Sequence, residues 1–315
     1  MTRARAEAGH DQTLAAAELR LIARILREEA GIEVTEAKGA LVASRLAKRL
    51  RALRLPGFEA YCALIASEAG APERVHMISA LTTNVTRFFR EPHHFDDLRA
   101  RLAGALGERA RRGERVRLWS AGCSSGEEPY SLALTVLEAL PDAPSLDLRI
   151  LATDIDPVVL ARAEAGRYPA DALDDVPAAL RARHFERVAD DLLAVGEAPR
   201  RLVVVRPLNL VRRWPLRGPF DAIFCRNVAI YFDAETQAEL WRRFASLLRP
   251  DGRLHIGHSE RLSGPAAAAL RLCGTTTYGR PSSEGPGTAT PRRGGAATLR
   301  APAPGAATAG EAPCR

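Results

Sequence analysis

The sequence predicts an α/β fold, in which helices cover both faces of a parallel sheet, preceded by an all-α N-terminal segment. Apolar, β-favouring runs begin at Val116, Leu148 and Ala222, and a helical pattern follows each of them. This repeated strand–helix order is typical of a parallel sheet buried on both faces. From about Thr13 to Ala80, apolar residues recur at helical spacing instead, and no strand pattern interrupts them.

Length and composition limit the class of protein. The 315 residues suffice for two domains, and 46% of them are hydrophobic. No run approaches the ~20 apolar residues of a membrane helix, and the N-terminus lacks the apolar core of a signal peptide. Five cysteines without a CxxC pair predict neither a zinc site nor a disulfide framework. We therefore expect a cytoplasmic protein, with a disordered tail over the Pro-, Gly- and Ala-rich residues 281–315.

The net charge of +7 is mostly arginine and suits either nucleic acid or an acidic protein surface. Within the helical segment, a basic stripe runs beside the apolar positions Leu46, Leu50 and Leu53. Its cations are Arg45, Lys48, Arg49, Arg51 and Arg54. Such a stripe is either a solvated helix face or a docking surface for an acidic partner, and the pattern alone leaves both open.

A polar and aromatic stretch, Leu81–Phe95, precedes the α/β part. Asn84, Thr86 and Arg90 offer hydrogen-bond donors and acceptors within it. The pair His93–His94 suggests a metal, but adjacent side chains point to different sides of a helix, and no third ligand stands at metal spacing. We therefore expect no metal site.

The stretch Val116–Leu134 combines a strand, a turn of small residues and a helix start. Ser125 and Glu128 fit a capping box, and Pro129 suits the first helical turn. Helix amides above the carboxyl end of a strand face the crevice in which open α/β sheets bind ligands. The alternative is an ordinary β–α turn without a ligand.

Polar residues also end the next two strands. Asp154 follows the strand Leu148–Thr153 and is placed to accept hydrogen bonds from ribose hydroxyls. Its alternative role is to cap the next helix, for which Asp156 is better placed. Arg226–Asn227 follows the strand Ala222–Cys225, with Tyr231 within one turn. This pair either meets a ligand or begins a solvated loop.

A small β insertion is predicted in the middle of the α/β part, over about 184–206. We expect its turn at Gly196–Pro199 and a strand at Leu202–Val205. An exposed insertion edge suits docking of a peptide by strand addition. Asn209 and Leu210 then follow the last strand of this region.

The loops favour a particular cofactor. The chain contains neither GxxxxGK nor a full GxGxxG, so a triphosphate loop is not supported. Glu127 and Glu128 would repel a pyrophosphate but suit a cation. S-adenosylmethionine fits better, because Asp154 would bind its ribose and the small-residue turn would admit its amino-acid portion.

Five stretches together resemble the CheR-type chemotaxis receptor glutamate O-methyltransferases. In order, they are LTTNVTRFFREPHHF, WSAGCSSGEEPYSLA, ATDIDPVVLARA, FDAIFCRNVAIYF and LLRPDGRLHIGHSE. The resemblance covers about Leu19–Tyr278. It implies a helical domain at 1–85 and a methyltransferase domain at 86–280, the latter a Rossmann-like class I sheet with a small antiparallel β insertion.

The resemblance also implies the roles of individual residues. Cofactor contacts fall on Asn84, Thr86, Arg90, Glu128, Asp154, Asn209, Leu210, Arg226 and Asn227. Arg90 and Tyr231 match residues near the transferred methyl group and are expected to position the acceptor. The implied acceptor is the γ-carboxylate of glutamates on chemoreceptor cytoplasmic helices. That carboxylate is already ionised at pH 7 and needs no general base.

The implied partner is the chemoreceptor, docked through the basic helix Arg45–Arg54 and the β insertion. We expect a monomer that binds no nucleic acid and does not insert into membranes. The insertion looks short and lacks a glycine-rich tip, which favours an enzyme that does not bind a receptor C-terminal pentapeptide. The alternatives are a methyltransferase of another substrate, such as RNA, and a non-catalytic binding protein for S-adenosylmethionine.

Overall fold

The computed structural model describes residues 14–280, so the predicted tail at 281–315 lies outside the described residues. The N-terminal part is helical, as predicted. The four helices are α1 (Ala16–Ala30), α2 (Gly39–Leu53), α3 (Phe58–Ala66) and α4 (Ala71–Leu81). Leu26 and Leu46 are fully buried, because the apolar stripes of these helices face one another. Helix α1 ends where Gly31 adopts a left-handed φ of 69°.

A seven-stranded sheet comes next, in the order β6-β2-β1-β7-β8-β10-β9. The strands are β1 (Val116–Ala121), β2 (Leu148–Asp154), β6 (Val203–Pro207), β7 (Phe220–Cys225), β8 (Leu248–Ile256), β9 (Arg271–Gly274) and β10 (Thr277–Gly279). The first five pair in parallel with one another, and the last two are antiparallel to their neighbours. The predicted α/β fold is therefore confirmed.

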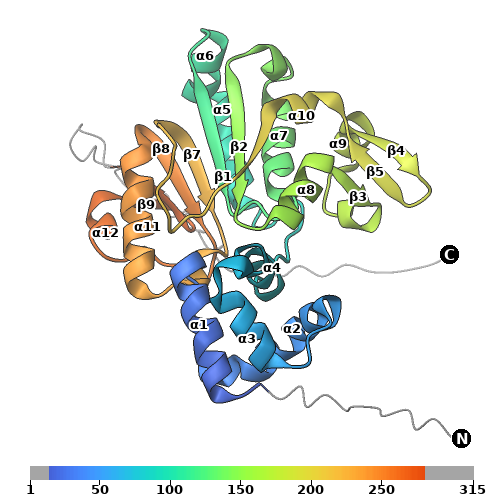
Figure 1. Cartoon of the computed structure of the whole chain (residues 1–315). Helices are drawn as coiled ribbons and strands as arrows, with labels where there is room; N and C mark the ends of the chain where they lie inside the picture. The colour runs from blue at the N-terminus through green and yellow to red at the C-terminus, as the bar shows by residue number, and fades with distance from the viewer. Residues whose placement is uncertain (1–13, 281–315) are drawn as a thin grey trace, which may run out of the picture. The chain divides into compact units, whose positions relative to one another are not determined.

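Two sets of helices cover the sheet (Figure 1). They are α5 (His93–Ala103), α6 (Ala105–Arg111), α7 (Glu127–Ala139), α8 (Pro157–Ala165), α10 (Glu197–Leu202), α11 (Ala234–Leu247) and α12 (Ala266–Ala269). Leu118 packs in the core formed with α5, α6 and α7, whereas its neighbour Trp119 points to the opposite face. There Trp119 shares a core with α11 and the N-terminal helices. The helical segment and the sheet thus bury apolar surface together.

The small antiparallel sheet is present, but its boundaries differ from the prediction. It pairs β3 (Arg167–Pro169) and β4 (Phe185–Ala189) with the central β5 (Leu192–Val195), next to α9 (Ala178–His184). In Figure 1 it lies beyond the β6 edge of the main sheet.

The insertion predicted over 184–206 was therefore wrong at its C-terminal end. The expected turn at Gly196–Pro199 is the start of α10, and the polar pair Asp190–Asp191 makes the hairpin turn instead. The expected strand at Leu202–Val205 corresponds to β6, which pairs in parallel with β2 in the main sheet. Its run of three valines suits that sheet because Val203 and Val205 join apolar clusters there.

The helices of residues 14–280 include none that is both long enough and apolar enough to span a membrane.

Candidate active site

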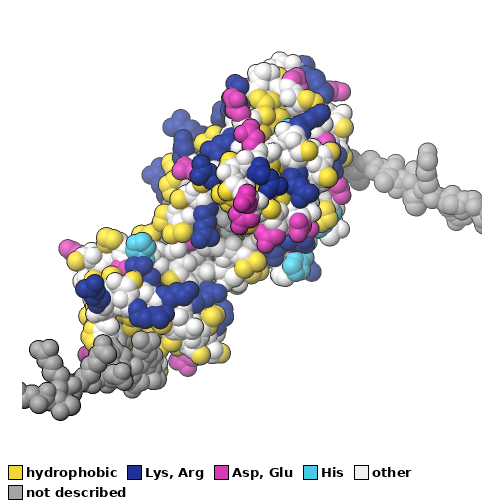
Figure 2. Space-filling model, turned by 90° about the vertical axis from the view of Figure 1, so that its right-hand side faces the viewer, with side chains coloured by type: hydrophobic (Ala, Val, Ile, Leu, Met, Phe, Trp, Pro, Cys, Tyr) yellow, Lys and Arg dark blue, Asp and Glu magenta, His cyan; other side chains and the backbone are white. Residues whose placement is uncertain are grey.

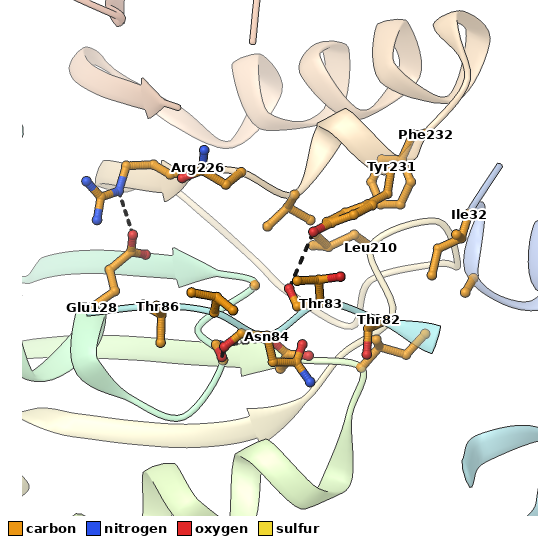
Figure 3. A pocket seen from close by; sticks show the side chains of 18 of the residues that line it. Ile32, Thr82, Thr83, Asn84, Thr86, Glu128, Leu210, Arg226, Tyr231 and Phe232 are labelled. Atoms are coloured by element: carbon orange, nitrogen blue, oxygen red, sulfur yellow. Dashed lines mark hydrogen bonds and ion pairs between the residues drawn. The ribbon is translucent and has the colours of Figure 1, made fainter. Parts of the chain in front are cut away.

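One cavity brings together the site residues that were predicted from the sequence (Figure 3). It lies beyond the carboxyl ends of β1, β2, β6 and β7. Its walls include Asn84, Thr86, Arg90, Glu128, Asp154, Asn209, Leu210, Arg226, Asn227 and Tyr231. This edge of a parallel sheet is where α/β proteins bind ligands.

The turn after β1 forms one wall and depends on left-handed backbone. Gly122 has a φ of 84°, and a Cβ atom there would lie 2.3 Å from Val228 Cγ2. The predicted capping box is wrong, because Gly126 is the N-cap of α7 and offers no side chain. Ser125 instead donates its hydroxyl to the carboxylate of Glu127, at 2.7 Å to Oε2. The turn therefore brings backbone, rather than side chains, close to the cavity.

Glu128 and Arg226 form a buried ion pair at the back of the cavity. Arg226 Nε donates to Glu128 Oε2 at 2.6 Å, and Ser120 donates its hydroxyl to Oε1 at 2.7 Å. The guanidinium also donates to the carbonyl of Arg90. Glu127, whose pKa is raised by burial, is absent from the cavity lining. Neither glutamate presents an unpaired charge to a ligand, contrary to the prediction that both attract a cation.

Asp154 and Asp156 have separate tasks. The carboxylate of Asp154 accepts hydrogen bonds from the backbone amides of Ser124 and Asp156, at 2.9 and 3.0 Å. Burial raises its pKa, and these backbone bonds oppose the shift. Asp156 caps α8 through the amide of Val158, which confirms its predicted role. Asp156 also accepts from the Asn84 amide, at 2.8 Å. Asp154 remains the carboxylate on the cavity wall, where the ribose was expected.

Arg90 and Tyr231 line the cavity from two separate segments of the chain, and the side chain of each forms few hydrogen bonds. Arg90 Nη1 donates to the carbonyl of Val85 at 3.3 Å, and the Tyr231 hydroxyl donates to the carbonyl of Thr83 at 3.4 Å. Within residues 14–280 their side chains form no other hydrogen bond, so most of the Arg90 donors remain free. A planar guanidinium of this kind suits a carboxylate.

The N-terminal helices supply a wall that sequence reasoning missed. Ala30 and Ile32 line the cavity, although they lie far from the other lining residues in sequence. Ile32 pairs with Phe232, and the amide of Glu33 donates to the carbonyl of Tyr231 at 2.9 Å. The sequence marks the end of α1 at Gly31, but its pattern contains no signal that places Ile32 on the wall.

The same end of α1 holds a predicted cofactor residue in place. Asn209 Nδ2 donates to the carbonyl of Glu29 at 2.6 Å, while its Oδ1 accepts from the amide of Val211. Both polar ends of this side chain are therefore occupied by protein groups. Each end has only this one partner among the described residues, so Asn209 can still offer a ligand the second N–H of Nδ2 and the second lone pair of Oδ1.

The lining fits S-adenosylmethionine. Asn227 Oδ1 is buried and has no hydrogen-bond partner among the described residues, so a ligand donor would complete it. Ile155 and Leu208 add apolar surface next to Asp154, which suits a base joined to a ribose. A carboxylate for the ribose, a buried amide oxygen that has no partner among the described residues and a wall of backbone groups correspond to the polar groups of this cofactor.

A group of possible metal ligands lies next to the cavity but does not suit a cation. The ligand atoms of Glu91, His93 and His94 lie within 4.8 Å of one another, and the two imidazole centroids are 4.1 Å apart. The prediction that the histidines point to different sides was therefore wrong. Arg226 Nη1 lies 3.3 Å from His94 Nδ1, and burial, followed by the Arg226 charge, lowers the pKa of His94 to about 3. A metal ion there would face a buried guanidinium.

Comparison with known proteins identifies the family. Residues 84–278 match the model for the CheR methyltransferase SAM-binding domain, and residues 17–82 match the model for the CheR methyltransferase all-alpha domain. The chain is 51% identical to the "Probable chemotaxis protein methyltransferase" of Rhizobium etli, over 81% of this chain and 96% of that protein. It is 42% identical to the "Chemotaxis protein methyltransferase" of Escherichia coli, over 84% of this chain and 91% of that protein.

These matches cover both the helical segment and the sheet that carries the cavity. They agree with the lining, which fits S-adenosylmethionine on its own evidence. The chain therefore belongs to the CheR methyltransferase family, and its cofactor is S-adenosylmethionine.

Proposed function

We propose that the protein transfers the methyl group of S-adenosylmethionine to side-chain carboxylates of glutamates on chemoreceptors, giving glutamate methyl esters and S-adenosylhomocysteine. The observation that carries this proposal is the free guanidinium of Arg90 in a cavity without a free base. Among the described lining residues there is no His, Lys or Cys, and the carboxylates of Glu128 and Asp154 already accept hydrogen bonds. An acceptor that is already anionic fits such a site best.

The proposed mechanism is consistent with this chemistry. S-adenosylmethionine supplies an electrophilic methyl group. A glutamate carboxylate, whose reference pKa is about 4.3, is a nucleophile at neutral pH without losing a proton. Arg90 binds that carboxylate through two of its N–H groups, and the Tyr231 hydroxyl fixes its orientation. Catalysis then rests on alignment, which supplies effective molarities of roughly 10⁵ M or more.

The cofactor residues of this proposal are the nine predicted from the sequence: Asn84, Thr86, Arg90, Glu128, Asp154, Asn209, Leu210, Arg226 and Asn227. For four of them, we assign two kinds of role. Asp154 and Asn227 offer polar atoms directly to the ligand, which their position on the wall supports. Glu128 and Arg226 act as a neutral pair that closes the back of the cavity.

The acceptor enters through a second cavity that adjoins the first. Its walls are Val85, Thr86, Arg87, Arg90, Glu91, Pro92 and His258. Val85, Thr86 and Arg90 line both cavities, so Arg90 stands where they meet. Val85 is 78% exposed beside Arg87, which offers an incoming segment an apolar contact next to positive charge. A glutamate in the second cavity would reach the cofactor past Arg90.

The receptor docks on the exposed part of the basic helix. Arg45 donates to the carbonyls of Leu81 and Thr82, and Arg49 pairs with Glu73, so these two cations are engaged within the protein. The proposed docking face therefore consists of the remaining cations of the stripe, on α2 and at its end: Lys48, Arg51 and Arg54.

Figure 2 shows Lys and Arg side chains gathered over the N-terminal helices on the side where α2 lies in Figure 1. Such a face would steer an acidic receptor helix. The second predicted contact is the small antiparallel sheet. Its β4–β5 hairpin turns at Asp190–Asp191. This short, acidic tip supports the hypothesis that the enzyme does not bind a receptor C-terminal pentapeptide.

The test is methyl transfer to a purified receptor cytoplasmic fragment from labelled S-adenosylmethionine. We expect label on the receptor that mild base releases as methanol, because carboxyl methyl esters are base-labile. Arg90→Ala should reduce the rate of transfer by roughly hundredfold. Arg242→Ala is the matched control, since Arg242 is an exposed arginine on α11 that pairs with Glu239 away from the cavity. Base-stable label, or transfer to RNA alone, would contradict the proposal.

A further inference from the structure

A single buried carboxylate holds the loop that begins after β7. Glu260 is 4% exposed, and each of its oxygens accepts two backbone amides. Oε1 accepts from Val228 and Ala229, at 2.9 and 2.8 Å. Oε2 accepts from Asn227 and Gly257, at 3.0 and 2.6 Å. Through these four hydrogen bonds, the buried carboxylate holds together the loop at residues 227–229 and the loop at Gly257.

The loop that it holds carries two residues of the proposed reaction. Asn227 has a φ of 59°, a left-handed conformation that asparagine tolerates better than most residues other than glycine. A Cβ atom on Gly257 would lie 2.8 Å from Asn227 Nδ2, so the asparagine packs directly on that glycine. The backbone that carries this side chain, with its buried and unpaired Oδ1, is thus held by Glu260 at the cavity wall.

Tyr231 depends on the same anchor. Val228 and Ala229 begin the short turn Ala229–Tyr231, in which the Tyr231 amide donates to the carbonyl of Val228 at 3.2 Å. Three consecutive amides, 227–229, form a nest of the kind that binds anions. Here Glu260 occupies the nest, so the direction of the turn, and with it the Tyr231 ring, is set by a protein group before any ligand arrives.

We propose that Glu260 is a positioning residue for methyl transfer, which fixes Asn227 against the cofactor and Tyr231 against the acceptor. The inference rests on the proposed function and adds to it a residue that touches neither ligand. Since small displacements of aligned groups lower reaction rates steeply, the loss of this anchor should be seen in turnover as well as in cofactor affinity.

The test compares two buried carboxylates at opposite ends of β7. Glu260→Gln keeps the size of the side chain but turns one oxygen into an N–H₂ group that faces two amide donors. Asp221→Asn is the matched control, because Asp221 is 1% exposed and accepts from the amide of Arg117 and from Arg109 at the far end of the strand. Both full-length variants are assayed for unfolding temperature, Kd for S-adenosylhomocysteine, and kcat and KM with the receptor fragment.

For Glu260→Gln we expect a fall in kcat of roughly hundredfold and weaker cofactor binding, with KM for the receptor fragment unchanged. Asp221→Asn should lower the unfolding temperature and leave Kd and kcat as in the parent. Unchanged kcat and Kd in folded Glu260→Gln, or equal losses in Asp221→Asn, would overturn the proposal.

Hydrogen exchange in the unaltered protein covers the case in which Glu260→Gln does not fold. The amides of residues 227–229 should be protected without any ligand, and rapid exchange at these amides would overturn the proposal. Failure of the proposed function is separate, since it would appear as absent receptor methylation by the parent protein. In that case the Kd comparison still tests the role of Glu260.

Discussion

Arg49 of α2 donates two hydrogen bonds to the carboxylate of Glu73 of α4, at 2.9 and 2.6 Å, and Tyr61 donates its hydroxyl to the same carboxylate at 3.0 Å. The Glu73 side chain is 7% exposed and that of Arg49 is 24% exposed, so this arginine is engaged between the helices rather than free on their surface. The pairing divides the basic stripe into cations that hold the helices together and cations that are free to meet a partner.

The first prediction separates those two groups. Arg49→Glu should lower the free energy of unfolding by about 3 kcal/mol, because it places two carboxylates together in a buried site. Arg51→Glu, on the exposed face, should change stability little and raise KM for the receptor fragment. Urea unfolding and methylation kinetics measure the two effects. A loss of stability in Arg51→Glu equal to that in Arg49→Glu would contradict the division.

The second prediction tests the N-terminal wall of the cavity. A Cβ atom on Gly31 would lie 2.5 Å from Val211 Cγ1, so Gly31→Ala should displace the chain beside Ala30 and Ile32 and weaken binding of S-adenosylhomocysteine. Gly113→Ala is its control, since Gly113 also has a positive φ, 78°, but has nothing within 4 Å of the added atom.

Both glycine variants should lose about 1 kcal/mol of stability from the left-handed backbone. Only Gly31→Ala should raise the Kd, as measured by calorimetry. Equal Kd values for the two variants would show that the end of α1 does not shape the cofactor site.

The third prediction concerns pH. Burial raises the pKa of Asp154 above its ordinary value of 3.8. A ribose hydroxyl donates best to the ionised carboxylate, so affinity for S-adenosylhomocysteine should be constant near neutral pH and fall as the pH drops through that raised pKa. Calorimetry across this pH range measures how the affinity falls on the acid side. Asp154→Asn should bind more weakly at neutral pH and show a flatter profile, and an unchanged acid limb in that variant would assign it to another group.

The fourth prediction concerns turnover. Arg90→Ala should reduce kcat by roughly hundredfold, since it removes the donors that hold the acceptor carboxylate. Arg90→Lys should recover only part of the activity, because an ammonium lacks the planar fork. Arg87→Ala removes a neighbouring arginine that is 60% exposed and pairs with Asp175, and should affect KM for the receptor fragment rather than kcat. Steady-state kinetics with saturating cofactor distinguish these outcomes.

The residues at the carboxyl ends of strands were predictable, because each comes directly after an apolar run that is typical of a strand. Asp154 and Arg226–Asn227 were found in this way and line the cavity. Ile32 was not found, since its place on the wall depends on how α1 packs against the loop at Phe232. Glu260 was not singled out from the sequence, because its role depends on its four backbone amide partners.

In the insertion, the local sequence pattern predicted the wrong structure because pairing with the main sheet determines where the strand lies. Gly196–Pro199 has turn residues, yet Gly196 caps a short helix and the strand after it joins β2. The partners of charged side chains could not be predicted from the sequence either. Arg49 and Arg51 look alike in the helical pattern, and only the position of Glu73 on α4 separates their roles.

The most direct test of the proposed glutamate methylation is tandem mass spectrometry of a receptor cytoplasmic fragment after incubation with the protein and S-adenosylmethionine. We predict one added methyl group on glutamate side chains, lost again after mild base and strongly reduced with Arg90→Ala. Methyl groups on lysine, arginine or the chain terminus, or none at all under conditions in which the protein binds the cofactor, would contradict this prediction.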